Sequence, residues 1–273
     1  MITFPNAKIN LGLNVLRRRD DGFHDIESLF YPIPLCDILE IIEKPVKSDL
    51  PIFTNTGLSV DSPAEKNLCV KAYHLLNADF KLPEIVIHLH KIIPFGAGLG
   101  GGSADAAFTI TLLNKLFSLS LSSEMMRNYA AQLGSDCAFF IHNKPVFAEG
   151  RGEILNPIDL DLTGYYILLV KPNNNVSTAE AYKGVRPRIP KQRLTKSIHL
   201  PIEDWKKSII NDFEEHIFKK QTQLKSIKEK LYQSGAIYAA MSGSGSTIYG
   251  LFKNDPLVAD AEFNNCFTWI GKL

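Results

Sequence analysis

The sequence lacks an excess of charge of either sign. Its 30 lysines and arginines are balanced by 29 aspartates and glutamates, which gives a formal net charge of +1. A broad basic surface of the kind that binds nucleic acid is therefore not expected. An anion site in this protein must be built from local groups.

Long apolar runs and paired cysteines are lacking as well. No stretch approaches the roughly 20 apolar residues that span a bilayer, and the N-terminus shows no signal peptide. The scattered cysteines, without a CxxC pair, favour free thiols in a reducing compartment: Cys36, Cys69, Cys137 and Cys266. We therefore expect a cytoplasmic protein, monomeric or homodimeric, whose partner is a small molecule rather than nucleic acid or a membrane.

What is present is an ordinary globular composition, 45% apolar and 22% charged. A chain of 273 residues buries roughly 75% of its unfolded surface and can form one large domain or two smaller ones. The Asn156-Pro157 pair marks a turn and suggests a boundary. We expect an N-terminal domain over residues 1–155 and a C-terminal domain over residues 156–273.

Hydrophobic periodicity predicts mixed strands and helices. Strands are expected at 9–15, 23–30, 37–43, 85–90, 165–170, 236–240 and 247–252, with a hairpin turn at Asp21-Gly22. Helices are expected at 67–77, 104–117, 122–133 and through most of 205–233. Ser103 is the expected N-cap of the second helix, and Gly134 the expected end of the third. Residues 184–196 are basic and proline-bearing, which indicates a surface excursion.

The strongest functional signal is a glycine-rich loop over residues 96–103, here called the first glycine loop. Its glycines remove every Cβ that would hold a ligand away from the backbone. The loop leads directly into a helix, whose first N–H groups lack intrahelical partners and lie at the positive end of the helix dipole. A phosphate site is therefore predicted, with these candidate residues: Pro94, Gly96, Gly98, Leu99, Gly100, Gly101, Gly102 and Ser103.

Other glycine-rich motifs fit this loop less well. A Walker loop ends in Gly-Lys-Ser/Thr, whereas Gly102-Ser103-Ala104 supplies no lysine. A Rossmann loop follows its strand at once and is followed about 20 residues later by an acid. Here residues 91–94 intervene, and residues 117–123 carry no acid. A tight turn that packs a helix closely, without a ligand, is the remaining structural alternative.

A second glycine loop, residues 242–246, lies between two apolar strands. It is either an ordinary hairpin turn or a segment that contacts the same phosphates with hydroxyl and amide donors. Gly243 and Ser244 are its candidate ligand-binding residues.

Lys8 and Asp136 are candidates for catalysis. On pattern alone, Lys8 is a solvated strand lysine and Asp136 a cap or turn residue. The functional alternative pairs them, because a carboxylate can accept a hydroxyl proton during phosphoryl transfer. A nearby lysine would keep that carboxylate ionised and stabilise the phosphoryl oxygens.

His88 and His90 lie on one side of a predicted strand, as a pair of metal ligands would. A third ligand of matching spacing is not evident in the sequence. Ordinary strand residues are the favoured interpretation.

Taken together, these segments resemble the GHMP kinase superfamily. The resemblance is carried by the Lys8 strand, by the Pro-x-Gly-x-Gly-Leu-Gly-Gly-Gly-Ser sequence and by the late Gly-Ser-Gly. It is dense over residues 5–155, then sparse, and returns at residues 211–214 and 242–246. It implies a two-domain α/β fold, with an N-terminal domain like ribosomal protein S5 domain 2 and a ferredoxin-like C-terminal α/β sandwich, and an active site in a cleft between them.

The resemblance also implies an ATP-dependent kinase of small alcohols. The segments around Lys8 and His24 are closest to the branch that serves non-mevalonate isoprenoid synthesis, whose alcohol carries a cytidine diphosphate group. Mevalonate, homoserine or sugar kinases of the superfamily remain the alternatives, as does a nucleotide-binding regulator without catalysis.

Site residues follow from the same resemblance. Asp136 falls at the catalytic base and Lys8 at its partner lysine. Asn10 falls at a substrate contact and His24 at the reader of the cytosine edge. Phe23 replaces the usual stacking tyrosine, so it can stack but cannot donate a hydroxyl hydrogen bond. Three further expectations complete the site: Tyr182 as the second aromatic wall, adenine near the Asn67 helix, and Mg²⁺ on the ATP phosphates, assisted by Ser103.

Overall fold

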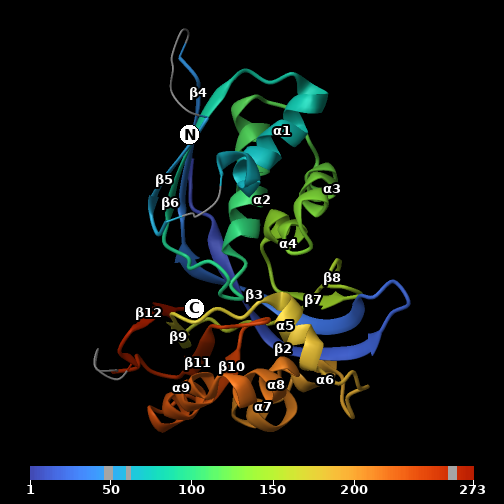
Figure 1. The fold of residues 1–273 in the computed structure, drawn as a ribbon, viewed down its shortest axis with the longest axis vertical. Coiled ribbons are helices and arrows are strands. Elements are labelled where there is room, and N and C mark those ends of the chain that lie inside the picture. The colour runs from blue at the N-terminus through green and yellow to red at the C-terminus, as the bar shows by residue number, and fades with distance from the viewer. Residues whose placement is uncertain (46–51, 60–62, 258–262) are drawn as a thin grey trace. The chain divides into compact units, whose positions relative to one another are not determined.

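A computed structural model describes residues 1–45, 52–59, 63–257 and 263–273 (Figure 1). Backbone contacts divide the chain into two compact units. Unit 1 contains Met1–Ala7, Leu35–Phe95 and Gly100–Lys144. Unit 2 contains Lys8–Pro34, Gly96–Leu99 and Pro145–Leu273. The sequence-based division at residue 155 stays a prediction.

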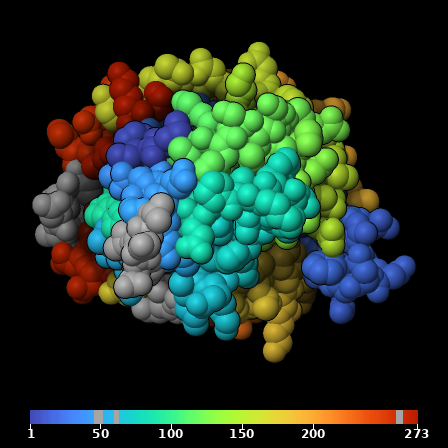
Figure 2. Space-filling model, turned by 90° about the horizontal axis from the view of Figure 1, so that it is seen from above, coloured from blue at the N-terminus to red at the C-terminus, as the bar shows by residue number. Residues whose placement is uncertain are grey.

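Unit 1 packs a helical layer on one face of a sheet (Figure 1). The sheet has the strand order β1-β4-β6-β5 and consists of β1 (Ile2–Thr3), β4 (Ile38–Glu43), β5 (Phe53–Gly57) and β6 (Ile85–Lys91). The helices are η1 (Ala64–Lys66), α1 (Leu68–Phe80), α2 (Gly101–Leu116), α3 (Ser123–Leu133) and α4 (Cys137–His142). α1 contacts α3 in this layer, and Figure 2, seen from above, shows blue-green atoms adjoining green ones there.

Strand alternation builds the core of unit 1. β4 pairs antiparallel with β6 and sets Ile41 opposite Ile87. The side chains of Ile85, Ile87 and Leu89 are buried against the helices, as period-2 patterning predicts. The same alternation places Lys91, the last residue of β6, on the buried face. A lysine there needs charged partners, and these lie under the first turn of α2.

The opposite face of β6 carries His88 and His90. Thr54 lies 2.8 Å from His88 Nδ1, and Thr56 lies 2.9 Å from His90 Nδ1. Over the described residues, clusters of three or more His, Cys, Asp or Glu side chains suited to a metal ion are not found. The neighbours of both imidazole rings are threonine hydroxyls of β5.

Unit 2 contains most of two sheets. One has the order β2-β3-β7-β8, with β2 (Asn6–Arg18), β3 (His24–Cys36), β7 (Val146–Glu149) and β8 (Ile154–Pro157). The other has the order β10-β11-β9-β12, with β9 (Tyr166–Pro172), β10 (Tyr238–Met241), β11 (Ile248–Phe252) and β12 (Cys266–Lys272). The predicted turn at Asp21-Gly22 joins β2 to β3, and Gly22 has φ +84° there.

Helices cover the second sheet (Figure 1). They are α5 (Thr178–Gly184), α7 (Ile202–Ser208), α8 (Phe213–Lys220) and α9 (Thr222–Gln233). The short helix α6 (Leu194–Ser197) lies instead against β2, where a Cβ on Gly12 would be 2.8 Å from the Leu194 side chain. Leu224, Ile227 and Leu231 recur at helical spacing on α9 and are buried in the core of this unit. That spacing is the amphipathic stripe that a surface helix buries.

The expected surface excursion at residues 184–196 is only partly exposed. Ile189 is 83% exposed, but Leu194 is fully buried. The guanidinium of Arg193 pairs with the buried carboxylate of Glu27, which also accepts a hydrogen bond from the Leu194 N–H. The segment is therefore anchored on β3.

Two further findings concern the cysteines and the length of the apolar helices. All four cysteines lie in the described part and are free thiols, as predicted. Among the described residues, a helix both long and apolar enough to cross a lipid bilayer is not found.

Candidate functional site

The first glycine loop bends through left-handed backbone conformations. Gly96, Gly98 and Gly100 have φ values of +59°, +74° and +71°, which favour glycine over residues with a Cβ. Within unit 2, the carbonyl of Leu99 accepts a hydrogen bond from the Lys8 N–H at 2.9 Å, and that of Ala97 accepts one from the Thr247 N–H at 3.2 Å. Both carbonyl oxygens are therefore bonded within unit 2. This suits an anion site, because carbonyl oxygens facing the anion would repel it.

The second glycine loop is a hairpin connection between β10 and β11. Its Ser242 N–H donates to the Thr247 carbonyl at 2.9 Å, as in a hairpin, while a contact of this loop with phosphates stays a prediction. The loop also contacts the first glycine loop, because the Ser242 hydroxyl donates to the Gly98 carbonyl at 2.7 Å. A Cβ on Gly98 would lie 2.0 Å from the Ser242 carbonyl oxygen. The two loops therefore meet by backbone, with glycine required at the contact.

Lys8 and Asn10 form a buried polar pair beside this contact. Lys8 is 3% exposed, so the solvated-lysine alternative is wrong. Its ammonium donates to Asn10 Oδ1 at 2.6 Å and lies 4.5 Å from the centre of the Phe30 ring. Asn10 in turn donates to the Ser28 hydroxyl at 2.9 Å, and its N–H donates to Ser242 at 3.2 Å. The burial arises because both faces of this part of β2 are covered.

In unit 1, α2 begins earlier than the sequence predicted. Its first residue is Gly101 and its N-cap is Gly100, so the expected N-cap, Ser103, lies inside the first turn. The left-handed Gly100 starts the helix, and Gly101 permits close packing because a Cβ there would lie 2.8 Å from Ile93. The Ser103 side chain hydrogen-bonds the Cys137 thiol, whose pKa burial raises to about 11. The positive end of the α2 dipole, which suits an anion, therefore lies at Gly101, closer to the first glycine loop than the sequence predicted.

Beneath this helix start lies a buried charge cluster that sequence analysis missed. The Lys91 ammonium pairs with Asp37 and, at 2.7 Å, with Asp105. Asp37 also accepts hydrogen bonds from the N–H groups of Ile92 and Ile93 at 2.6 and 2.8 Å. A Cβ on Gly101 would lie 3.0 Å from the Lys91 ammonium. The cluster thus fixes both the end of β6 and the start of α2.

One lysine shared by two buried carboxylates cannot keep both fully ionised. Burial raises the pKa of Asp105 to about 7. The positive charge of Lys91 lowers this pKa, and the negative charge of Asp37 raises it. The pKa of Lys91 is raised by the two carboxylates, despite its burial. The cluster therefore changes charge near neutral pH through Asp105.

Asp136 and Asn67 occupy helix starts in unit 1. Asp136 is the N-cap residue of α4, as the turn-residue alternative allowed. Asn67 is the N-cap of α1, and its side chain accepts a hydrogen bond from the Cys69 N–H at 2.9 Å. Their roles toward the hydroxyl proton and adenine stay predictions, as does the pairing of Asp136 with Lys8 of unit 2.

The nucleobase candidates form an aromatic group in unit 2. His24 and Tyr182 are stacked, with ring centres 4.8 Å apart and an interplanar angle of 19°. Burial, and then the charge of Arg18, lowers the pKa of His24, which favours the neutral ring that both donates and accepts hydrogen bonds. Phe23 is 56% exposed, and the Arg151 guanidinium lies 5.1 Å from its ring centre. No local sequence pattern indicates that cation–π contact.

Comparison with known proteins places these features in a family. The model of the GHMP kinases N terminal domain matches residues 67–144, and that of the GHMP kinases C terminal matches residues 201–270. The chain belongs to the GHMP kinase family. The two-domain α/β fold class expected from the sequence is confirmed.

Within that family, several similar relatives share one name. A 4-diphosphocytidyl-2-C-methyl-D-erythritol kinase of Parabacteroides distasonis is 50% identical, and the alignment covers all of both chains. The kinase of the same name from Bacteroides fragilis is 51% identical, again over all of both chains. A crystal structure of 4-(cytidine 5'-diphospho)-2C-methyl-D-erythritol kinase is similar with a TM-score of 0.81 at 29% identity, covering 99% of this chain and 98% of that one. A mevalonate kinase structure, with a TM-score of 0.71 at 15% identity, shares the fold.

Proposed function

We propose that this chain transfers the γ-phosphoryl group of ATP to the 2-hydroxyl of 4-diphosphocytidyl-2-C-methyl-D-erythritol and releases ADP, in non-mevalonate isoprenoid precursor synthesis. The observation that carries the proposal is the full-length similarity, near 50% identity, to kinases named for that substrate. The alignments cover the whole chain, and so include the segments around Lys8 and His24.

The first glycine loop is the proposed site of the ATP phosphates. The backbone at Gly98 approaches Ser242 so closely that a Cβ is excluded, and the loop leads into α2 at Gly101. We propose that amides of the loop and of the first turn of α2 bind the phosphates, with adenine near Asn67. Mg²⁺, carried on the phosphates and assisted by Ser103, would neutralise their charge.

Phosphoryl transfer needs one proton acceptor and one cation beside the reacting oxygens. Asp136 is the proposed acceptor of the hydroxyl proton as the bond from oxygen to the γ-phosphorus forms and the bond to ADP breaks. Lys8 is the proposed cation, since its buried ammonium is oriented by Asn10 and can stabilise negative charge on the phosphoryl oxygens. Such positioning and electrostatic stabilisation would supply most of the rate acceleration.

The cytidine group is the proposed anchor of the acceptor. His24 would hydrogen-bond the cytosine edge, and Phe23 and Tyr182 would supply aromatic faces. Gly243 and Ser244 are the proposed contacts to the reacting end of the acceptor, next to the ATP phosphates and apart from the cytosine. The stacked pair of His24 and Tyr182 supports this role, because it fixes the imidazole plane.

A comparison of acceptors tests the proposal. The protein is incubated with ATP and, in parallel, with the cytidyl alcohol, mevalonate or homoserine, and the phosphorylated product is followed by mass. We expect phosphorylation of the cytidyl alcohol alone. Preferred phosphorylation of mevalonate or homoserine would instead identify another kinase of the family.

A further inference from the structure

The residues Asn211, Asp212, Phe213 and Glu214, here called the 211–214 segment, lie at the start of α8. Their sequence is part of the family resemblance, but the proposed function assigns them nothing. Three of the four side chains are buried. The backbone of the segment lies beside β2, with the Asp212 N–H donating to the Leu13 carbonyl at 2.8 Å.

We propose that the 211–214 segment is a double positioning element: Asn211 and Glu214 set the second glycine loop, while Phe213 sets Tyr182 against His24. The inference rests on the proposed function, because it assigns one arm to the ATP phosphates and the other to the cytidyl group. Each residue acts through a neighbour and is therefore a positioning residue.

The loop arm consists of hydrogen bonds to the backbone. The Asn211 amide donates to the carbonyls of Met241 and Gly243, both at 2.8 Å. Glu214 accepts a hydrogen bond from the Met241 N–H at 2.7 Å, and its other oxygen pairs with Lys228 at 2.6 Å. These bonds fix the backbone on both sides of Ser242, the residue whose hydroxyl donates to Gly98.

The aromatic arm starts from the next side chain. The Phe213 ring meets Tyr182 edge to face, with centres 4.9 Å apart at 78°. The Tyr182 ring also stacks on the His24 ring. An edge-to-face contact restricts the tilt of a ring as well as its position. Phe213 therefore determines the plane in which Tyr182 and His24 would meet a base.

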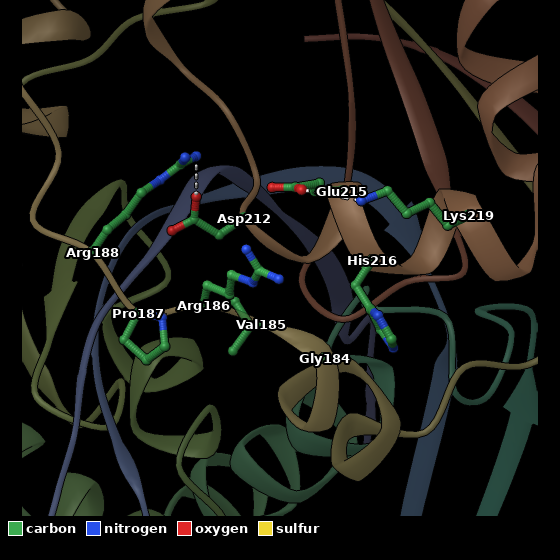
Figure 3. A pocket seen from close by; sticks show the side chains of 9 residues that line it. All are labelled: Gly184, Val185, Arg186, Pro187, Arg188, Asp212, Glu215, His216 and Lys219. Atoms are coloured by element: carbon green, nitrogen blue, oxygen red, sulfur yellow. Dashed lines mark hydrogen bonds and ion pairs between the residues drawn. The ribbon is translucent and has the colours of Figure 1, made fainter.

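Further contacts hold α5, the helix of Tyr182, and the chain that follows it on the start of α8. A Cβ on Gly184 would lie 2.0 Å from the His216 ring, so the helix end lies directly on that ring. Asp212 accepts hydrogen bonds from the Val15 N–H at 2.8 Å and from Arg188 at 3.1 Å. Figure 3 shows Arg188 and Asp212 joined beside a cavity of about 430 Å³, to which Gly184 and His216 also contribute.

The two arms can be separated experimentally because they start from different side chains. Asn211→Asp keeps the side-chain volume and the acceptor for the Phe213 N–H but replaces two amide donations with a carboxylate facing two carbonyls. Phe213→Leu keeps an apolar side chain in the core but removes the edge-to-face contact. Glu215→Gln is the control on the same helix, since it alters an exposed pair with Lys219.

The experiment measures dissociation constants for cytidine 5'-diphosphate and for a non-hydrolysable ATP analogue, together with kcat and KM. We expect Asn211→Asp to weaken the ATP analogue by roughly tenfold or more and to leave cytidine diphosphate within about twofold. Phe213→Leu should weaken cytidine diphosphate by roughly two- to tenfold and leave the ATP analogue within about twofold. Glu215→Gln should match the unaltered protein.

Equal losses for both ligands in both variants would overturn the inference, since a general loss of folding predicts them. If Asn211→Asp does not fold, Ser242→Ala tests the loop arm, and an unchanged affinity for the ATP analogue there overturns it. Glu214→Gln keeps an acceptor for the Met241 N–H and should retain most ATP-analogue affinity.

The binding measurements do not need turnover. Phosphorylation of a different alcohol would therefore contradict the proposed function but would leave this test valid. An unaltered protein that binds no cytidine diphosphate would overturn both.

Discussion

The hydroxyl of Ser242 donates a hydrogen bond to the carbonyl of Gly98 at 2.7 Å, across 144 positions of the sequence. The same hydroxyl accepts the Asn10 N–H at 3.2 Å, and the side chain of Asn10 accepts a hydrogen bond from the Lys8 ammonium. One serine thus connects the two glycine loops to the candidate catalytic lysine. The proposed phosphate site depends on this close backbone contact.

The contact predicts a strong effect of adding one methyl group at Gly98. In Gly98→Ala, the new Cβ would lie 2.0 Å from the Ser242 carbonyl oxygen, so the loops must move apart. We expect about tenfold or greater weakening of a non-hydrolysable ATP analogue, measured by calorimetry. The matched control is Gly164→Ala, which has φ +92° but open space around its Cβ. It should lose about 1 kcal/mol of stability and keep its affinity; equal affinity losses in the two variants would contradict the account.

Asp136→Asn tests the proposed proton acceptor. The amide has nearly the same shape as the carboxylate but cannot accept the hydroxyl proton. We expect kcat to fall by roughly 10²- to 10⁴-fold, with ATP-analogue affinity changed by less than about threefold. Rapid-quench or steady-state ADP measurements give kcat, and the exposed Asp159→Asn is the control. Turnover near that of the control would remove Asp136 from the mechanism.

His24→Ala tests recognition of the cytosine edge. Loss of hydrogen bonds to the base, and of the ring on which Tyr182 stacks, should raise KM for the cytidyl substrate by roughly 10- to 100-fold. KM for ATP should change by less than about twofold. The exposed His199→Ala serves as the control. A parallel rise in both KM values would show that His24 supports the fold instead of reading the base.

Asp105 predicts a pH dependence of stability. The pKa of this carboxyl is about 7 in the folded protein, against an ordinary value of 3.8. Between these two pH values, the folded protein therefore holds the proton and the unfolded chain releases it. The free energy of unfolding contributed by this group therefore falls as pH rises from about 4 to about 7 and levels off above. In Asp105→Asn this loss is absent.

The measurement is chemical denaturation of both proteins between pH 5 and pH 8. The stability of Asp105→Asn relative to the unaltered protein should rise with pH, by an amount on the order of a few kcal/mol. Gln132→Ala, which changes no ionisable group, is the control and should give a constant difference. A constant difference for Asp105→Asn would mean that its carboxyl is ionised throughout this range.

The sequence predicted those features that depend on local pattern. Alternation located β6, helical spacing located α1 and α3, and Gly134 ends α3 as expected. The start of α2 was placed too late because a left-handed Gly100 can replace the expected serine cap. The short strands β5, β7, β8 and β12 were missed, because four to seven residues of mixed polarity carry little periodic signal.

Long-range polar contacts had no local pattern to reveal them. Nothing in the spacing connects Lys91 to Asp37, 54 positions away, or Asn211 to the second glycine loop. The burial of Lys8 was likewise hidden, because its strand is covered on both faces. The family resemblance pointed to Tyr182 as an aromatic wall; the structure shows its ring stacked on His24, and its role toward a base stays a prediction.

The most direct test of the account is ADP release by the purified protein with Mg²⁺, ATP and 4-diphosphocytidyl-2-C-methyl-D-erythritol, compared with the same mixture lacking the alcohol. The account predicts that ADP forms at a substantial rate only when the alcohol is present. One ADP should form for each 2-phosphate that phosphorus NMR detects. ADP formation at the same rate without the alcohol, or a new phosphate on a hydroxyl other than the 2-hydroxyl, would contradict it.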